Sequence, residues 1–157
     1  MVVVLFICLA WIFILIFIGL FRKLPLVVNS LLFMAIDIVL TNKLTIIGFN
    51  SRSFQLNTGI LPFIALILHN DFIVPFVLLT FANVFLATPK IAVRISIALY
   101  AFFVQLLLGL ALRWHNILID KDWNFVKESV MILLLMLFTL VLGRLFQRMA
   151  RKEGWVR

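Results

Sequence analysis

Two acidic residues, Asp37 and Asp71, fall within or at the edge of long apolar segments. A carboxylate in hydrocarbon is costly, so such residues point either to chemistry or to a specific structural pairing. On a helix, Ser30, Asp37 and Thr41 would share one face, because seven and then four residues separate them. The two aspartates could line a path for protons or cations. Alternatively, Asp37 is protonated or paired with a neighbouring helix and Asp71 lies near the outer surface. We favour this structural interpretation.

Two amides complete the candidate polar site within the membrane. Asn83 lies on the same apolar segment as Asp71, twelve residues further on. Gln105 lies between Ala101 and Gly109 at four-residue spacing, and small residues beside an amide allow close helix packing and a hydrogen bond between helices. For Gln105, packing is a better interpretation than ligand binding. The candidate site therefore consists of Asp37, Asp71, Asn83 and Gln105.

Motifs for catalysis, cofactors or metals are missing from the sequence. It has no Gly-x-Ser-x-Gly, Walker or Gly-x-Gly-x-x-Gly motif, and its two histidines, His69 and His115, are far apart. We therefore expect no enzyme, no catalytic residue, no cofactor and no metal ion. One further polar stretch alternates in charge, which predicts a solvated loop that neutralises itself; its residues are Arg113, Asp120, Lys121, Asp122, Lys127 and Glu128.

The composition indicates a protein whose solvent is mostly lipid. The 157 residues are 66% hydrophobic and only 13% charged, with a mean hydropathy of +1.25. A soluble domain of this length would not leave so much apolar surface exposed. We predict an all-α, polytopic transmembrane bundle in a single domain. The net charge of +8 is explained by topology and by attraction to anionic lipid, so we expect no nucleic-acid partner.

Five segments are long enough to span a bilayer as helices. They cover about residues 2–21, 26–48, 60–88, 91–112 and 124–147, followed by a short basic tail at 148–157. Residues 58–69 have two interpretations: they belong to the third helix, or they form an interfacial or re-entrant piece. Twelve residues reach only about 18 Å, too short for a separate crossing of about 30 Å.

The basic residues orient this five-span arrangement. Nine of the fourteen lie on the side that holds the 22–25 turn, the 89–90 turn and the carboxyl-terminal tail. The positive-inside rule therefore predicts an amino terminus outside and a carboxyl terminus in the cytoplasm. A basic cluster at the end of the last helix should reach anionic phospholipid headgroups, with a docked protein partner as the alternative. Its residues are Arg144, Arg148, Arg151 and Lys152.

The second half of the chain resembles a family of small multi-spanning membrane proteins of spore-forming Gram-positive bacteria. The matching features are the run from Asn70 to Pro75 that opens a span, Asn83 within it, and Asp122-Trp123-Asn124 before a last helix with a basic end. The resemblance covers roughly residues 69–150. It implies this architecture and a location in the bacterial inner membrane, and it brings no activity with it.

Two functions follow as hypotheses. The first is a non-catalytic subunit or accessory of a membrane complex, as a homo- or hetero-oligomer with membrane proteins, because no catalytic constellation accompanies the polar stripes. The second is a small transporter or channel for protons, cations or another solute that uses Asp37 and Asp71.

Overall fold

Runs of Leu, Ile, Val and Phe make up most of the chain, and in lipid such runs fold as helices because a helix satisfies its own backbone polar groups. The computed structural model describes residues 2–20, 24–46, 54–57, 59–120 and 124–153. Within these ranges the helices are α1 (Val2–Leu20), α2 (Leu26–Lys43), α3 (Ile60–Ile67), the π-helix η2 (Leu68–Ile73), α4 (Val74–Ala87), α5 (Ile91–Trp114) and α6 (Phe125–Lys152). The prediction of an all-α fold is confirmed.

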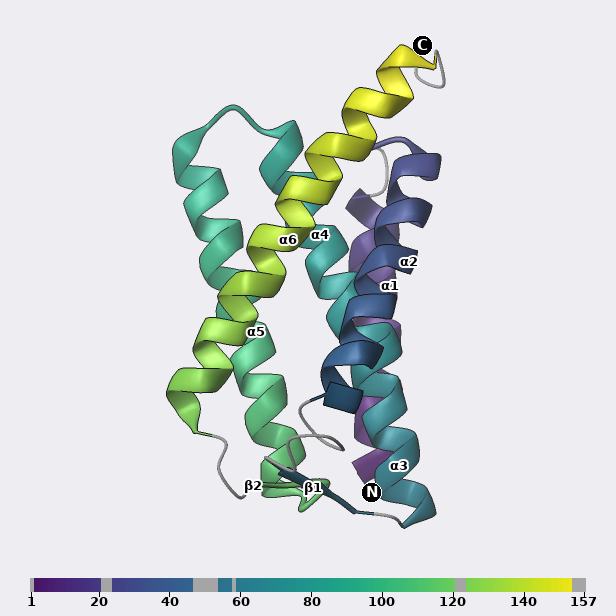
Figure 1. Ribbon diagram of the computed structural model, residues 1–157, viewed down its shortest axis with the longest axis vertical. Helices are drawn as coiled ribbons and strands as arrows, with labels where there is room; N and C mark the ends of the chain where they lie inside the picture. Colours follow the sequence, from purple (N-terminus) through teal and green to yellow (C-terminus); the bar gives the residue numbers. More distant parts are fainter. Residues whose placement is uncertain (1, 21–23, 47–53, 58, 121–123, 154–157) are drawn as a thin grey trace.

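Five helices of the described chain are long and apolar enough to cross a membrane. The third is continuous, because α3, η2 and α4 follow one another without a break from residue 60 to residue 87. Residues 60–69 therefore belong to the third helix and do not form a separate re-entrant piece. Figure 1 shows the start of α1 and the end of α6 at opposite ends of the bundle, as an odd number of crossings requires. The last helix extends to Lys152, so Arg148, Arg151 and Lys152 are helical.

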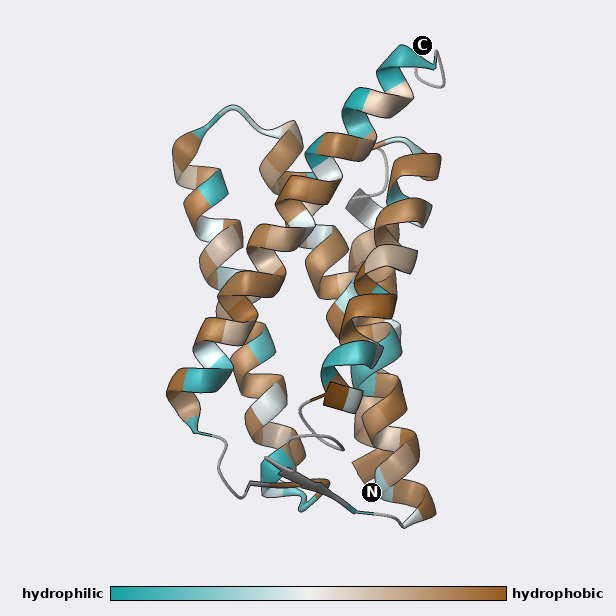
Figure 2. Ribbon diagram, in the orientation of Figure 1, coloured by the Kyte–Doolittle hydropathy of each residue, from teal (hydrophilic) through white to brown (hydrophobic). Residues whose placement is uncertain are grey.

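The third span is the centre of the bundle. It contacts α1, α2, α5 and α6, and every residue from Val77 to Val84 is buried. Aromatic rings join three elements on one side of it: Phe76 packs against Phe17 of α1 and Phe33 of α2, with ring centroids 5.4 and 5.6 Å apart. The other helices keep large apolar side chains exposed on their outer faces. Figure 2 shows that hydrophobic residues, in brown, make up most of each helix. These faces suit contact with lipid.

One feature of the fold departs from a purely helical arrangement. Strand β1 (Phe54–Leu56) pairs antiparallel with β2 (Leu118–Asp120), and the Asn57 amide donates to the Ile117 carbonyl at 3.1 Å. The sequence predicts loops at both places. Backbone groups outside the helices still need hydrogen-bond partners, and these two segments supply them to each other. The pairing also holds the start of α3 and the end of α5 at the same end of the bundle (Figure 1).

Candidate functional site

The turn of π-helix in the third span carries three consecutive polar residues. Element η2 contains His69, Asn70 and Asp71, of which the first two are buried. Its last bond runs from the Val74 amide to the His69 carbonyl, five residues back. The next residue, Pro75, has no amide proton to donate. The π-helix therefore ends at the point where the backbone hydrogen bonds of a regular α-helix would be interrupted in any case. π-Turns inside α-helices often occur at functional sites.

Four charged or titratable side chains meet beside this turn. Lys43 comes from the end of α2, Arg113 from the end of α5, Glu128 from the start of α6 and His69 from η2. Together with Asn70 they line a cavity of about 30 Å³, enough for one or two water molecules. We call these five residues the polar cluster. The His69 Nε2 atom is buried and has no hydrogen-bond partner among the described residues.

An ion pair between Arg113 and Glu128 closes the polar cluster toward α5 and α6. The Arg113 Nη2 atom donates to Glu128 Oε2 at 2.9 Å, and about a fifth of each side chain is exposed, 20% and 18%. Gly109 makes room for this pair, since a Cβ there would lie 3.2 Å from both Arg113 Nη1 and Glu128 Oε1. Arg113 and Glu128 therefore neutralise each other, as the sequence predicts, but they do so on two helices and largely shielded from solvent, so the prediction of a solvated loop is wrong for this pair. Residues 121–123 of that loop lie outside the described ranges.

The two candidate aspartates interact electrostatically with each other. Asp37 of α2 is within electrostatic range of Asp71, and the Asn70 Nδ2 group donates to Asp71 Oδ1 at 2.9 Å. Asn70 thus joins the aspartate pair to the polar cluster. The Asp37 Oδ1 atom is buried without a hydrogen-bond partner among the described residues, although the side chain as a whole is partly exposed.

The other two candidates, Asn83 and Gln105, have different surroundings. Asn83 forms a clamp: its Oδ1 accepts from the Leu24 amide at 3.1 Å, and its Nδ2 donates to Asn29 Oδ1 at 2.7 Å and to the Leu79 carbonyl at 2.9 Å. Asn29 completes the clamp by donating to the Leu24 carbonyl at 3.2 Å. Gln105 is buried in α5 and donates to the Ala101 carbonyl of its own helix at 3.2 Å. We interpret both as structural.

The polar stripe predicted on α2 does not face the bundle core. Ser30 and Thr41 are exposed and Asp37 is partly exposed, whereas Asn29, Ile36 and Leu40 are the residues buried against neighbouring helices. Beside this stripe lies a groove of about 310 Å³ between α1, α2 and α4. It is lined by Phe17, Leu26, Asn29, Ser30, Phe33, Met34, Phe76 and Leu79. We call it the α1–α2 groove.

The carboxyl-terminal end of α6, which carries the basic cluster, projects beyond the other helices (Figure 1). Arg144, Arg148, Arg151 and Lys152 are all exposed. Their binding to lipid headgroups stays a prediction.

Sequence reasoning did not identify the polar cluster. Lys43, His69, Arg113 and Glu128 come from four different elements, and helical periodicity relates only residues of one helix. The usable signal was that Lys43, Arg113 and Glu128 all fall at the ends of spans on the same side of the five-span arrangement. Comparison of the chain with protein-family models, curated proteins and solved structures finds no match. Among the described residues, no three His, Cys, Asp or Glu side chains could hold a metal ion together.

Proposed function

We propose that this chain is a non-catalytic subunit or accessory of a complex in a bacterial inner membrane, with its amino terminus outside and its carboxyl terminus in the cytoplasm. The observation that carries the proposal is Asp37. It lies on α2 eleven residues beyond Leu26, about 16 Å along the axis and so near the middle of a hydrocarbon core of about 30 Å. Its side chain is partly exposed there, with Ser30 and Thr41 exposed on the same face.

An ionisable group at this depth is unfavourable in contact with lipid. Insertion scales give about 2.5–3.5 kcal/mol for an aspartate at the centre of a span. A partner helix that donates a hydrogen bond to Asp37 would offset part of that cost, because such bonds contribute roughly 0.6–2 kcal/mol in membranes. The α1–α2 groove beside Asp37 offers a mostly apolar surface against which this helix could pack. Asp71 of η2 lies within electrostatic range of Asp37. We infer that the partner places an amide, Lys or Arg side chain near mid-membrane.

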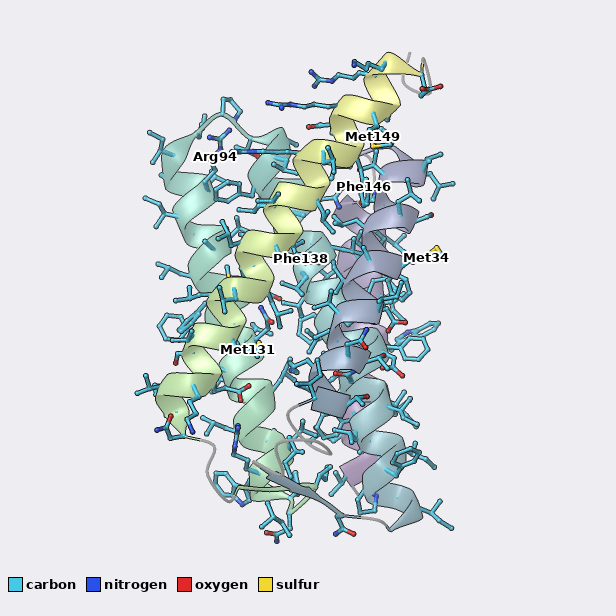
Figure 3. The ribbon with its side chains drawn as sticks, viewed as in Figure 1. Met34, Arg94, Met131, Phe138, Phe146 and Met149 are labelled. Atoms are coloured by element: carbon cyan, nitrogen blue, oxygen red, sulfur yellow. The ribbon has the colours of Figure 1, made fainter. Side chains whose placement is uncertain are left out.

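Crosslinking in native membranes tests this assembly. Met34 points away from the bundle in Figure 3 and is 62% exposed at the α1–α2 groove. In a Cys8→Ser background, Met34→Cys should give a crosslinked product of higher mass. Leu107→Cys on α5 is the matched control, equally exposed at 62%, and should give little product.

Adding Asp37→Leu to Met34→Cys should strongly reduce the crosslink, because the proposed hydrogen bond is then lost. Equal crosslinking at Met34 and Leu107, or a strictly monomeric protein in mild detergent by native mass spectrometry, would contradict the proposal.

A second candidate function is a proton or cation transporter, and one observation favours it. Asn70 both lines the cavity of the polar cluster and donates to Asp71, so polar groups extend from Lys43 and His69 to Asp71, with Asp37 within electrostatic range. Beyond this point, toward the start of α2, the third span is buried and mostly apolar from Val77 to Val84. Transport would require that layer to open.

Flux in proteoliposomes distinguishes the two functions. A transporter predicts a proton or cation flux above that of empty vesicles, which Asp37→Asn and Asp71→Asn each abolish. Flux equal to that of empty vesicles, or unchanged in both variants, would exclude transport through the aspartate pair and leave the subunit proposal intact.

A further inference from the structure

A second groove opens on the opposite side of the third span, between α4, α5 and α6. Its volume is about 590 Å³, and every lining residue but one is apolar. The exception is Arg94, which lies one turn into α5, close to the α4–α5 turn (Figure 3). The groove is lined by Phe85, Ile91, Arg94, Ile95, Ala98, Leu99, Phe102, Leu133 and Met136. We call it the α5–α6 groove.

Arg94 is held in place at the end of this groove. Its Nε atom donates to the Thr88 carbonyl at 2.7 Å, and its guanidinium carbon lies 5.5 Å from the centroid of the Phe85 ring. A guanidinium has five N–H donors, and the bond to Thr88 takes one of them. Among the described residues Arg94 makes no other hydrogen bond, so its terminal nitrogens can meet an anionic group at the mouth of the groove.

The length of the groove corresponds to one leaflet of a bilayer. On α5 its lining extends from Ile91 to Phe102, which is eleven residues or about 16 Å. Half of a hydrocarbon core of about 30 Å is nearly the same distance. The charged end therefore falls at headgroup level when Phe102 lies near the bilayer centre.

Other cationic side chains lie at the same end. Lys90 is exposed directly before α5. Arg144 is exposed on α6 and lies eleven residues, about three turns, beyond the lining residue Leu133, so both share one face of that helix. The groove thus combines an apolar wall one leaflet long with a cationic mouth.

We propose that the α5–α6 groove binds one acyl chain of an anionic phospholipid, with the lipid phosphate against Arg94. A second copy of this chain fits the groove poorly. Copies that share one membrane orientation would bring their own Arg144, Arg148, Arg151 and Lys152 to the same membrane surface, where like charges repel.

Native mass spectrometry of the full chain, released from mild detergent after addition of defined lipids, tests this site. The probes are phosphatidylglycerol and phosphatidylcholine with identical acyl chains. The wild-type protein should retain one phosphatidylglycerol molecule in preference to phosphatidylcholine. Arg94→Gln should weaken retention of phosphatidylglycerol about fivefold, the effect of losing one basic contact at the membrane surface. Lys127→Gln, which removes the same charge at an exposed position near the opposite end of α6, should change retention much less.

A second pair of variants tests the apolar wall. Ala98→Phe fills the groove and keeps Arg94, so it should weaken retention of both lipids. Ala92→Phe makes the same change at an exposed position of α5 outside the groove and should have no effect. Circular dichroism confirms that each variant is folded. Unchanged retention in either Arg94→Gln or Ala98→Phe overturns the proposal, as does a lipid-free dimer that Ala98→Phe disrupts.

Discussion

The clamp formed by Leu24, Asn29 and Asn83 makes a strong prediction about stability. In Asn83→Leu, which is close in volume, the Leu24 amide and Asn29 Oδ1 both lose their buried partner. Each orphaned group costs about 1–3 kcal/mol, although hydrogen bonds within membranes average nearer 0.6 kcal/mol. We expect a loss of about 2–4 kcal/mol in the free energy of unfolding. The Leu79 carbonyl contributes little, because it lies within the regular turns of α4.

Titration of the detergent-solubilised protein with sodium dodecyl sulfate, followed by circular dichroism, measures this loss. The double variant Asn29→Leu with Asn83→Leu should lose less than the sum of the single variants, because the second change removes a group that the first one orphaned. Gln105→Leu is the control: it also removes a buried amide, but one that donates to a carbonyl of its own helix, and it should lower the free energy of unfolding by under about 1 kcal/mol. If Asn83→Leu costs no more than Gln105→Leu, or if the two asparagines behave additively, the clamp does not hold α2 to α4.

Three further predictions concern other parts of the bundle. Gly143→Ala would bring a Cβ within 2.9 Å of Leu86 Cδ1, the end of a partly buried side chain that has to shift, so this contact should offset the gain of about 1 kcal/mol in helix propensity. Gly19→Ala meets nothing within 4 Å and should keep that gain. The same titration tests both, and equal effects would refute the packing argument. Arg113→Gln and Glu128→Gln should each lower the free energy of unfolding by about 1–2 kcal/mol, a range that allows for the partial exposure of both side chains. The double variant should recover part of that loss, and strict additivity would show that the ion pair contributes nothing. In a Cys8→Ser background in intact cells, an impermeant thiol reagent should label Asn116→Cys and Ser53→Cys but not a cysteine added after Arg157, and an unlabelled Ser53→Cys would contradict five crossings.

The sequence was sufficient for the helices because their signal is local. A run of about twenty apolar residues can satisfy its backbone in lipid only as a helix, and this single constraint predicts all five spans. The π-turn was not predictable in the same way, since one extra residue in a helix leaves no periodic signal. Pro75, four residues after Asp71, was its only local indication.

The candidate site was predicted only where one side chain alone was informative. Asp37 and Asp71 stood out because each is an ionisable residue within or beside an apolar run, and in the structure they lie within electrostatic range of each other. Asn83 was selected as a polar amide within an apolar run, yet its role depends on Asn29, 54 residues earlier, and nothing in the sequence around Asn29 predicts that contact. The polar cluster depends on four elements meeting, and that meeting is a property of packing between helices.

The pairing of β1 with β2 has a consequence for how the chain is inserted into the membrane. The two strands are separated by α3, η2, α4 and α5, so β1 emerges from the ribosome long before its partner. In the proposed orientation both strands lie outside, and β2 arrives there only after α5 has crossed. The backbone groups of β1 must therefore remain hydrated through two further insertion events. A nascent chain that stops before Leu118 lacks this pairing, and its 54–56 segment should stay open to an external protease until the fourth span is complete.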